Sequence, residues 1–150
     1  MSKDVLEIEI KGVFSVVQGY AIFVGTEAKV FIIYVDQSVG SAINMFLTKT
    51  AKERPLTHDL ITHIFSGFGI SADRVVINDL KGNTYYARLF LRSENELGKK
   101  LVEIDSRPSD ALALAVQQGC KIYCNRAVFD QVDDMSEVLD KIKDQSEGES

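Results

Sequence analysis

Two segments of the sequence join an Arg-Pro step to a hydroxyl residue and an aspartate where a helix is expected to begin. They read RPLTHDL over residues 54–60 and DSRPSDA over residues 105–111. The first N–H groups of a helix lack partners within it and form the positive end of its dipole, so a helix start beside an arginine suits an anion. An arginine can also contact two oxygens of one phosphate. The residues predicted to bind phosphate are Arg54, Thr57, Arg107 and Ser109.

Three acidic side chains accompany the second segment. Alternation along the preceding strand puts Glu103 and Asp105 on one of its faces, and Pro108 at the first helical position makes Arg107 the cap and Asp110 the third residue. Their carboxylates could converge where the strand becomes a helix. Such a group suits a hard divalent cation, Mg²⁺ or Mn²⁺, which takes oxygen ligands. The predicted metal ligands are Glu103, Asp105 and Asp110.

His58 adds a group that exchanges protons near neutral pH. On a regular helix it lies at the edge of an apolar stripe, and Asp59 lies almost opposite, where a solvated first-turn aspartate would sit. His63 follows five residues after His58, a spacing that puts the two rings on different faces and argues against a two-histidine metal site. We expect His63 at the surface.

Ordinary helix capping explains Asp110 without any ligand. A first-turn aspartate stabilises a helix by about 0.3–1 kcal/mol, and Arg107 then needs only solvent around it. The residues therefore leave three alternatives open: a catalytic site, a binding module without turnover, and a purely structural role.

The elements that must position these residues follow from the hydrophobic pattern. Single strands are predicted over residues 5–17, with a bend at Gly12, and over residues 99–105. Two β-hairpins are predicted, one over residues 19–36 with its turn at 25–27 and one over residues 73–92 with its turn at 81–83. Helices are predicted over 38–50, within 54–69, from Pro108 onward, and near 135–143. Within 54–69, one stripe holds Leu60, Ile61, Ile64, Phe65 and Phe68. The helix from Pro108 is apolar all round, which predicts that it is covered on more than one side.

Composition indicates one ordinary globular domain. The chain has 150 residues, 45% of them hydrophobic and 26% charged. The net charge of −5 argues against a surface that grips nucleic acid broadly, so any phosphate contact must be local. Cys120 and Cys124 are too few for a disulfide framework or a complete zinc site and are expected to be reduced structural thiols. No stretch resembles a signal peptide or a membrane span, which favours a cytoplasmic location.

The motifs RPLTHDLI, VVINDLKGNTYYARLFL and VEIDSRPSDALALAVQQGCKIYCNRAVF resemble the bifunctional nuclease (DNase/RNase) domain family, which is known from bacteria. The resemblance extends from about Val13 to Leu139. It implies an α+β fold with a mixed sheet, and we expect its hairpins to pack against several helices in one domain over residues 1–143. The polar stretch over 144–150 lacks apolar residues to pack, which predicts a disordered tail. One motif departs from the family: between Val35 and Gly40 the usual glutamate is replaced by Val39, with Asp36 nearby.

The resemblance implies a metal-assisted nuclease that hydrolyses phosphodiester bonds of DNA and RNA. In that hypothesis His58, Asp105 and Asp110 are catalytic, and the predicted arginines hold the phosphate. The alternative is a regulatory module on the same fold that binds an anion or a partner without catalysis. The expected partner is nucleic acid, held weakly through local phosphate contacts; no membrane is expected, and association into a homo-oligomer is left open.

Overall fold

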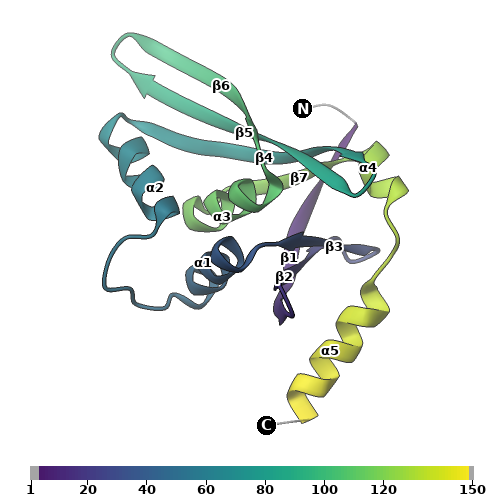
Figure 1. Cartoon of the computed structure of the whole chain (residues 1–150). Coiled ribbons are helices and arrows are strands. Elements are labelled where there is room, and N and C mark those ends of the chain that lie inside the picture. The colour runs from purple at the N-terminus through teal and green to yellow at the C-terminus, as the bar shows by residue number, and fades with distance from the viewer. Residues whose placement is uncertain (1–3, 149–150) are drawn as a thin grey trace.

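A computed structural model of the chain, described here for residues 4–148, shows a mixed sheet and helices arranged around it (Figure 1). The strands are β1 (Val5–Val16), β2 (Gly19–Gly25), β3 (Val30–Val35), β4 (Ile70–Lys81), β5 (Thr84–Asn95), β6 (Gly98–Ser106) and β7 (Lys121–Asn125). The helices are α1 (Gln37–Thr48), α2 (Thr57–Gly67), α3 (Pro108–Gln118), α4 (Arg126–Gln131) and α5 (Ser136–Gly148). The predicted α+β class is confirmed.

The sheet has the order β3-β2-β1-β7-β4-β5-β6. Neighbours in the sequence form the antiparallel pairs β1–β2, β2–β3, β4–β5 and β5–β6, as expected for hairpins. β7 lies between β1 and β4, antiparallel to the first and parallel to the second. The two runs of hairpins are therefore joined into one sheet by β7.

Turn chemistry explains the two predicted hairpins. Thr26 donates its N–H to the Lys29 carbonyl over 2.9 Å at the β2–β3 turn, and Gly82 adopts a φ of 62° at the β4–β5 turn, which a residue without a side chain does at no steric cost. The register of β1 against β2 shifts between Ile10 and Gly12, where the sequence predicts a bend.

α3 is the central helix of the core. Its residues Ala111 to Ala115 are all at most 4% exposed, and the helix packs against α1, α2 and the sheet. A helix that is apolar all round needs cover on several sides, as predicted. Pro108 occupies its first turn and Gly119 ends it at a φ of 70°.

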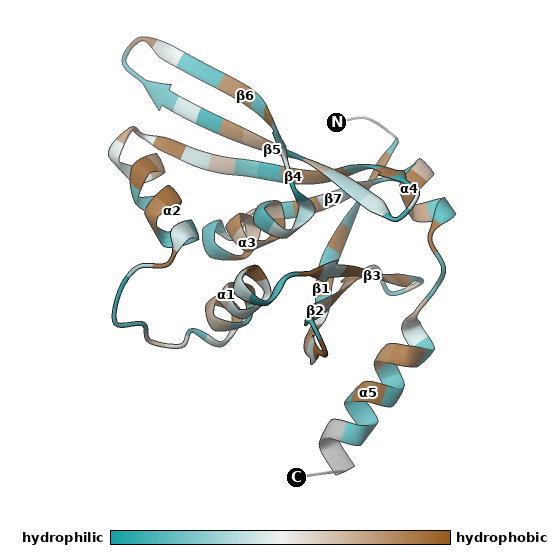
Figure 2. Ribbon diagram, viewed as in Figure 1, coloured by the Kyte–Doolittle hydropathy of each residue, from teal (hydrophilic) through white to brown (hydrophobic). Residues whose placement is uncertain are grey.

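α5 covers a second, smaller apolar cluster. Its residues alternate between hydrophobic and hydrophilic (Figure 2), and the buried Leu139 packs with Ala21, Phe23 and Val30 of the first hairpin. The predicted tail over 144–150 begins inside this helix, and residues 149–150 lie outside the described residues. No helix among the described residues is long and apolar enough to cross a membrane.

α2 differs from the pattern expected of it. Within its apolar stripe, Leu60, Ile64 and Phe68 are 56%, 49% and 77% exposed, whereas His58 and Asp59 are only 5% and 8% exposed. The expectation of a solvated Asp59 is wrong. The buried face of the helix holds Phe65 together with His58 and Asp59, whose side chains contact α3.

Candidate functional site

The first turns of three helices converge on one cavity of about 290 Å³. α1, α2 and α3 each begin there, and their starting residues supply most of its lining: Ser38, Val39, Leu56, Thr57, His58, Arg107 and Asp110. The positive ends of three helix dipoles therefore lie near the same space. This arrangement favours an anion more strongly than a single helix start does.

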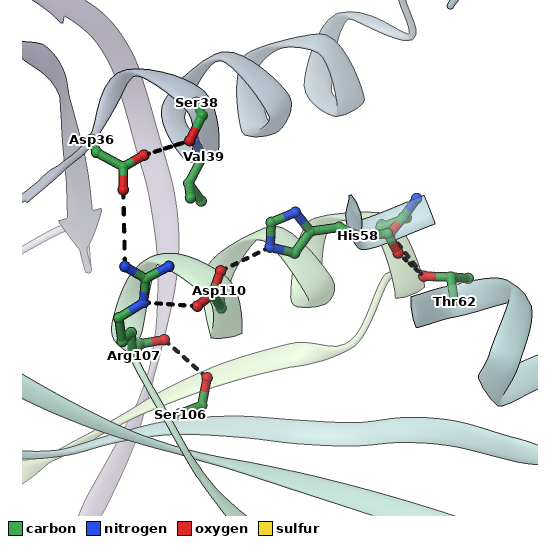
Figure 3. Close-up of polar contacts among 9 residues, drawn as sticks. Asp36, Ser38, Val39, His58, Thr62, Ser106, Arg107 and Asp110 are labelled. Atoms are coloured by element: carbon green, nitrogen blue, oxygen red, sulfur yellow. Dashed lines mark hydrogen bonds and ion pairs between the residues drawn. The ribbon is translucent and has the colours of Figure 1, made fainter. Parts of the chain in front are cut away.

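A chain of polar contacts links several residues that line this cavity (Figure 3). Asp110 takes a central place, with Oδ1 at 2.9 Å from His58 Nε2 and Oδ2 accepting from Arg107 Nε at 2.9 Å. Arg107 also pairs with Asp36, whose Oδ2 lies 3.9 Å from its terminal nitrogen. One aspartate thus positions both the histidine and the arginine, each from its own helix start.

Asp36 is the N-cap of α1. Its carboxylate accepts from the Val39 N–H at 3.0 Å and from the Ser38 hydroxyl at 2.9 Å. These two bonds, together with Arg107, hold the pKa of Asp36 below its usual value. The hydrogen bond from Arg107 to Asp110 in turn raises the pKa of that guanidinium. Both groups are charged throughout the physiological range.

A second polar cluster, formed by Lys52, Asp59, Thr62 and Gln117, fixes α2 against α3. Asp59 accepts from Lys52 Nζ at 2.8 Å, from the Leu56 N–H at 2.7 Å and from the Gln117 amide. Burial acts to raise the pKa of Asp59, but the bonds from Lys52 and Leu56 outweigh it and lower the pKa. Thr62 links the cluster to His58 by donating either to its carbonyl at 3.0 Å or to Gln117 at 2.8 Å.

The ring of His58 packs in an apolar setting. Phe46 meets it edge-on, with the ring centres 6.4 Å apart, and the Phe46 ring lies 4.6 Å from the ammonium of Lys52. The imidazole is thereby fixed in place from one side by Phe46 and from the other by Asp110. Nδ1 of His58 points away from Asp110, toward α1 (Figure 3).

The structure brings together only some of the predicted phosphate-binding residues. Thr57 and Arg107 line the cavity with His58 and Asp110, and Ser109 lines the neighbouring cavity that shares Arg107. Arg54 lines a different hollow, of about 220 Å³, with Asp59 and the exposed His63. The two Arg-Pro segments therefore contribute one arginine to this site.

The three carboxylates predicted to bind a metal do not converge. Ile104 pairs across β5–β6 with Leu89, which is buried beneath the helices, so alternation puts Glu103 and Asp105 on the opposite face of the sheet. There Glu103 Oε1 lies 3.7 Å from Arg88 Nε. Within residues 4–148, no group of three or more His, Cys, Asp or Glu side chains is placed to hold a metal ion.

Asp36, Ser38 and Val39 are functional candidates that sequence reasoning missed. They belong to the segment where the family pattern is lost, and its usual glutamate position is occupied by Val39. The available signal was the spacing of an N-cap aspartate just before the apolar residues of α1. Only the packing of α1 beside α3 shows that this cap faces Arg107.

Comparison with known proteins shows the family of the chain. The model of the bifunctional nuclease domain matches residues 22–137, which include all three helix starts. The chain belongs to the bifunctional nuclease domain family. Two uncharacterised proteins of Mycobacterium tuberculosis, one from strain CDC 1551 / Oshkosh and one from strain ATCC 25618 / H37Rv, are each 35% identical to it over 99 residues. The match covers 66% of this chain and 56% of each relative, so the chain spans little more than half of their length.

The two cysteines are free in this member of the bifunctional nuclease domain family. Burial raises the pKa of Cys124 to about 12, and burial also raises that of Cys120. Both are therefore protonated at neutral pH and suit structural positions, not nucleophilic ones.

Proposed function

We propose that the cavity at the three helix starts binds the phosphate of a nucleic acid and that His58 assists hydrolysis of its phosphodiester bond. The convergence of three helix N-termini on one histidine, one aspartate and one arginine carries this proposal. The description of the family as a bifunctional nuclease domain supports the choice of DNA and RNA as substrates.

Arg107 and the helix starts supply the positive potential. The guanidinium uses Nε for Asp110 and is 65% exposed on its side chain, so its terminal nitrogens can still donate to phosphate oxygens. The Thr57 hydroxyl and the first N–H groups of α2 and α3 add neutral donors. These donors stabilise the charge that builds up on the phosphoryl oxygens during attack.

His58 acts as the proton-transfer group. With Nε2–H donated to Asp110, Nδ1 carries the lone pair and can accept a proton from a water molecule. The water oxygen then forms a bond to phosphorus as the bond from phosphorus to the leaving oxygen breaks. The leaving oxygen takes up a proton from solvent on its own side of the phosphate, and the imidazolium then releases its proton to solvent, which restores the neutral ring.

The predicted divalent cation does not fit the side chains at this site. Both oxygens of Asp110 already accept from His58 and Arg107, and those of Asp36 face Ser38, Val39 and Arg107. Oxygens that face several donors are poor ligands for a hard cation. We therefore derive no step through a metal ion, and the need for Mg²⁺ or Mn²⁺ stays a prediction that cleavage assays with and without a chelator test.

The second candidate is a module that binds an anion or a partner without turnover. The net charge of −5 and the exposed site arginine, already paired with two aspartates, favour it. Such a module needs Arg107 but does not need proton transfer by His58.

Cleavage assays on single-stranded DNA and RNA separate the two functions. Replacing His58 with Gln is expected to lower kcat by about 10²–10⁴-fold, because the base is lost. The control is His63→Gln on the same helix, which is exposed and outside the cavity and is expected to cleave normally. Melting temperatures of both variants show whether the fold is intact.

Cleavage by the parent that persists in a folded His58→Gln variant would exclude the catalytic role of His58. Phosphate binding that depends on Arg107 without any cleavage by the parent, with or without divalent cations, would identify the binding module.

A further inference from the structure

A second cavity, of about 340 Å³, adjoins the first and shares Arg107 with it. Its walls come from three places: the end of β3, the β4–β5 turn and the start of α3. The size falls within the range of small-molecule sites, about 300–1,000 Å³. A group bound here would lie directly beside a phosphate held by Arg107.

The wall formed by β3 presents unpaired backbone groups. At this edge of the sheet, Val30 donates its N–H to Asp134 over 3.1 Å and accepts from the Met135 N–H over 2.7 Å. In an antiparallel ladder the outward residues alternate, so Tyr34 also turns its N–H and C=O outward. Among residues 4–148, no other group bonds to the Tyr34 backbone on that edge.

Side chains around the cavity add rings and further hydrogen-bonding groups. Tyr34 is 70% exposed although its neighbours in β3 are buried, and Tyr85 is held in place by stacking on Phe31 with ring centres 5.7 Å apart. Asn83 in the β4–β5 turn has an amide with no partner among the described residues. Ser109 is only 9% exposed, lines the cavity, and its hydroxyl likewise has no partner within residues 4–148.

We propose that this second cavity is a nucleobase subsite and that the substrate is a single-stranded nucleic acid. The inference rests on the proposed function, because it places the base next to the phosphate bound at Arg107. The N–H and C=O of Tyr34 lie side by side and match the adjacent donor and acceptor on the pairing edge of a base. That edge is free only when the base is unpaired, which excludes an intact duplex.

Stacking and polar recognition together set the expected size of the effect. Stacking of a base on an aromatic side chain is worth about 5- to 150-fold in affinity. A nucleoside 5′-monophosphate is therefore expected to bind at least about tenfold more tightly than ribose 5-phosphate, which offers the same phosphate and sugar without the base.

Isothermal titration of the full chain with adenosine 5′-monophosphate, uridine 5′-monophosphate and ribose 5-phosphate tests this subsite. Tyr34→Ala should weaken binding of both nucleotides by at least about fivefold, because the stacking ring is lost, and should leave binding of ribose 5-phosphate unchanged, whereas Tyr34→Phe should bind like the parent. The matched control is Tyr86→Ala, which removes a ring from β5 that does not line the cavity. Because Tyr34 is exposed, its replacement should not unfold the chain.

Equal affinity of the parent for nucleotides and ribose 5-phosphate would overturn the base subsite and leave the phosphate site standing. An equal loss in Tyr34→Ala and Tyr86→Ala would also overturn it. Failure of the parent to bind any of the three ligands would contradict both the subsite and the proposed function.

Discussion

At the scale of single residues, Asp110 determines which atom of His58 is available for chemistry. A carboxylate that faces Nε2 selects the tautomer with the proton on that nitrogen and leaves the lone pair on Nδ1. The same carboxylate accepts from Arg107, so one side chain holds both the proposed base and the proposed phosphate ligand. Asp110 lies in the first turn of α3, but its oxygens accept from His58 and Arg107 and do not cap the helix.

Comparing Asp110→Asn with Asp110→Ala tests this pairing. In Asp110→Asn one carboxylate oxygen becomes an amide NH₂ group, which can only donate. It must face either His58 or Arg107, which are themselves donors, so one of the two hydrogen bonds is lost and cleavage should fall by about 10²–10⁴-fold. Asp110→Ala should lose as much cleavage as Asp110→Asn. If Asp110 acted only as a helix cap, its replacement by Ala would instead lower stability by about 0.5–2 kcal/mol and leave cleavage unchanged. Single-turnover cleavage and thermal melts measure the two effects, and parental activity in both variants would contradict the pairing.

Asp59 gives the fold a predictable response to acid. Its pKa in the folded chain is lowered, so its contribution to stability is present above the pKa of the unfolded chain, about 3.9, and is lost as pH falls through the lower folded value. Asp59→Asn removes this dependence. Melting temperatures between about pH 2 and pH 7 should therefore converge for parent and variant at the acidic end. A constant difference across that range would contradict the prediction.

At the scale of elements, glycine allows α1 to lie close to the sheet. A Cβ on Gly40 would come within 2.4 Å of the Tyr20 ring, so the start of α1 reaches the site only because this side chain is absent. Gly67 in α2 has open space around it. The two glycines are a matched pair that separates packing from helix propensity.

Gly40→Ala is expected to destabilise the chain by about 1–3 kcal/mol, because Tyr20 must move. Gly67→Ala should stabilise it by about 0.4–1 kcal/mol, because a more flexible residue is removed from the unfolded chain. Chemical denaturation of both variants measures the difference. A gain of stability in Gly40→Ala would show that the contact between α1 and β2 is loose.

The sequence predicts elements better than it predicts their partners. Hairpins and the helix at Pro108 follow from local turns, caps and periodicity, and the structure confirms them. β7 and α4 had no separate prediction, because KIYCN is short and its pairing with β4 is parallel and distant in the sequence. The apolar stripe of α2 did not predict its buried face, because the buried Asp59 pairs with Lys52, which lies outside the helix.

The same limit explains the site. The two helix starts with His58, Arg107 and Asp110 were found from residue types at fixed spacing, and the structure places those residues in contact. Glu103 and Asp105 share a face of β6 as predicted, but alternation along a strand does not tell which face looks toward the helices, and the pairing of β6 with β5 puts them on the face opposite Asp110. Asp36 was not selected because only packing between α1 and α3 brings it to Arg107.

At the scale of the whole molecule, the proposed phosphate site belongs to an acidic chain. With a net charge of −5, long-range attraction to nucleic acid should be weak, so the proposed binding should depend on the groups around Arg107. Each phosphate neutralised contributes a slope of about −0.7 to log K against log salt for single strands. The slope for a single-stranded oligonucleotide should therefore be shallow, no steeper than about −1.5.

Fluorescence anisotropy over a range of salt concentrations measures that slope. Arg107→Gln is expected to reduce it toward zero, and Arg88→Gln, which changes a cation on the opposite face of the sheet, should leave it unchanged. A steep slope that survives Arg107→Gln would show that nucleic acid binds elsewhere on the surface.

The position of β7 in the sheet also has a consequence for synthesis of the chain. β7 pairs with β1 on one side and with β4 on the other. It is the last strand in the sequence, so β1 to β6 all leave the ribosome before it does. Until then, the facing edges of β1 and β4 are open and can pair with neighbouring chains. Assembly of the nascent protein thus waits for residues 121–125, and a pause in translation before them would lengthen the time during which the unfinished sheet is exposed to aggregation.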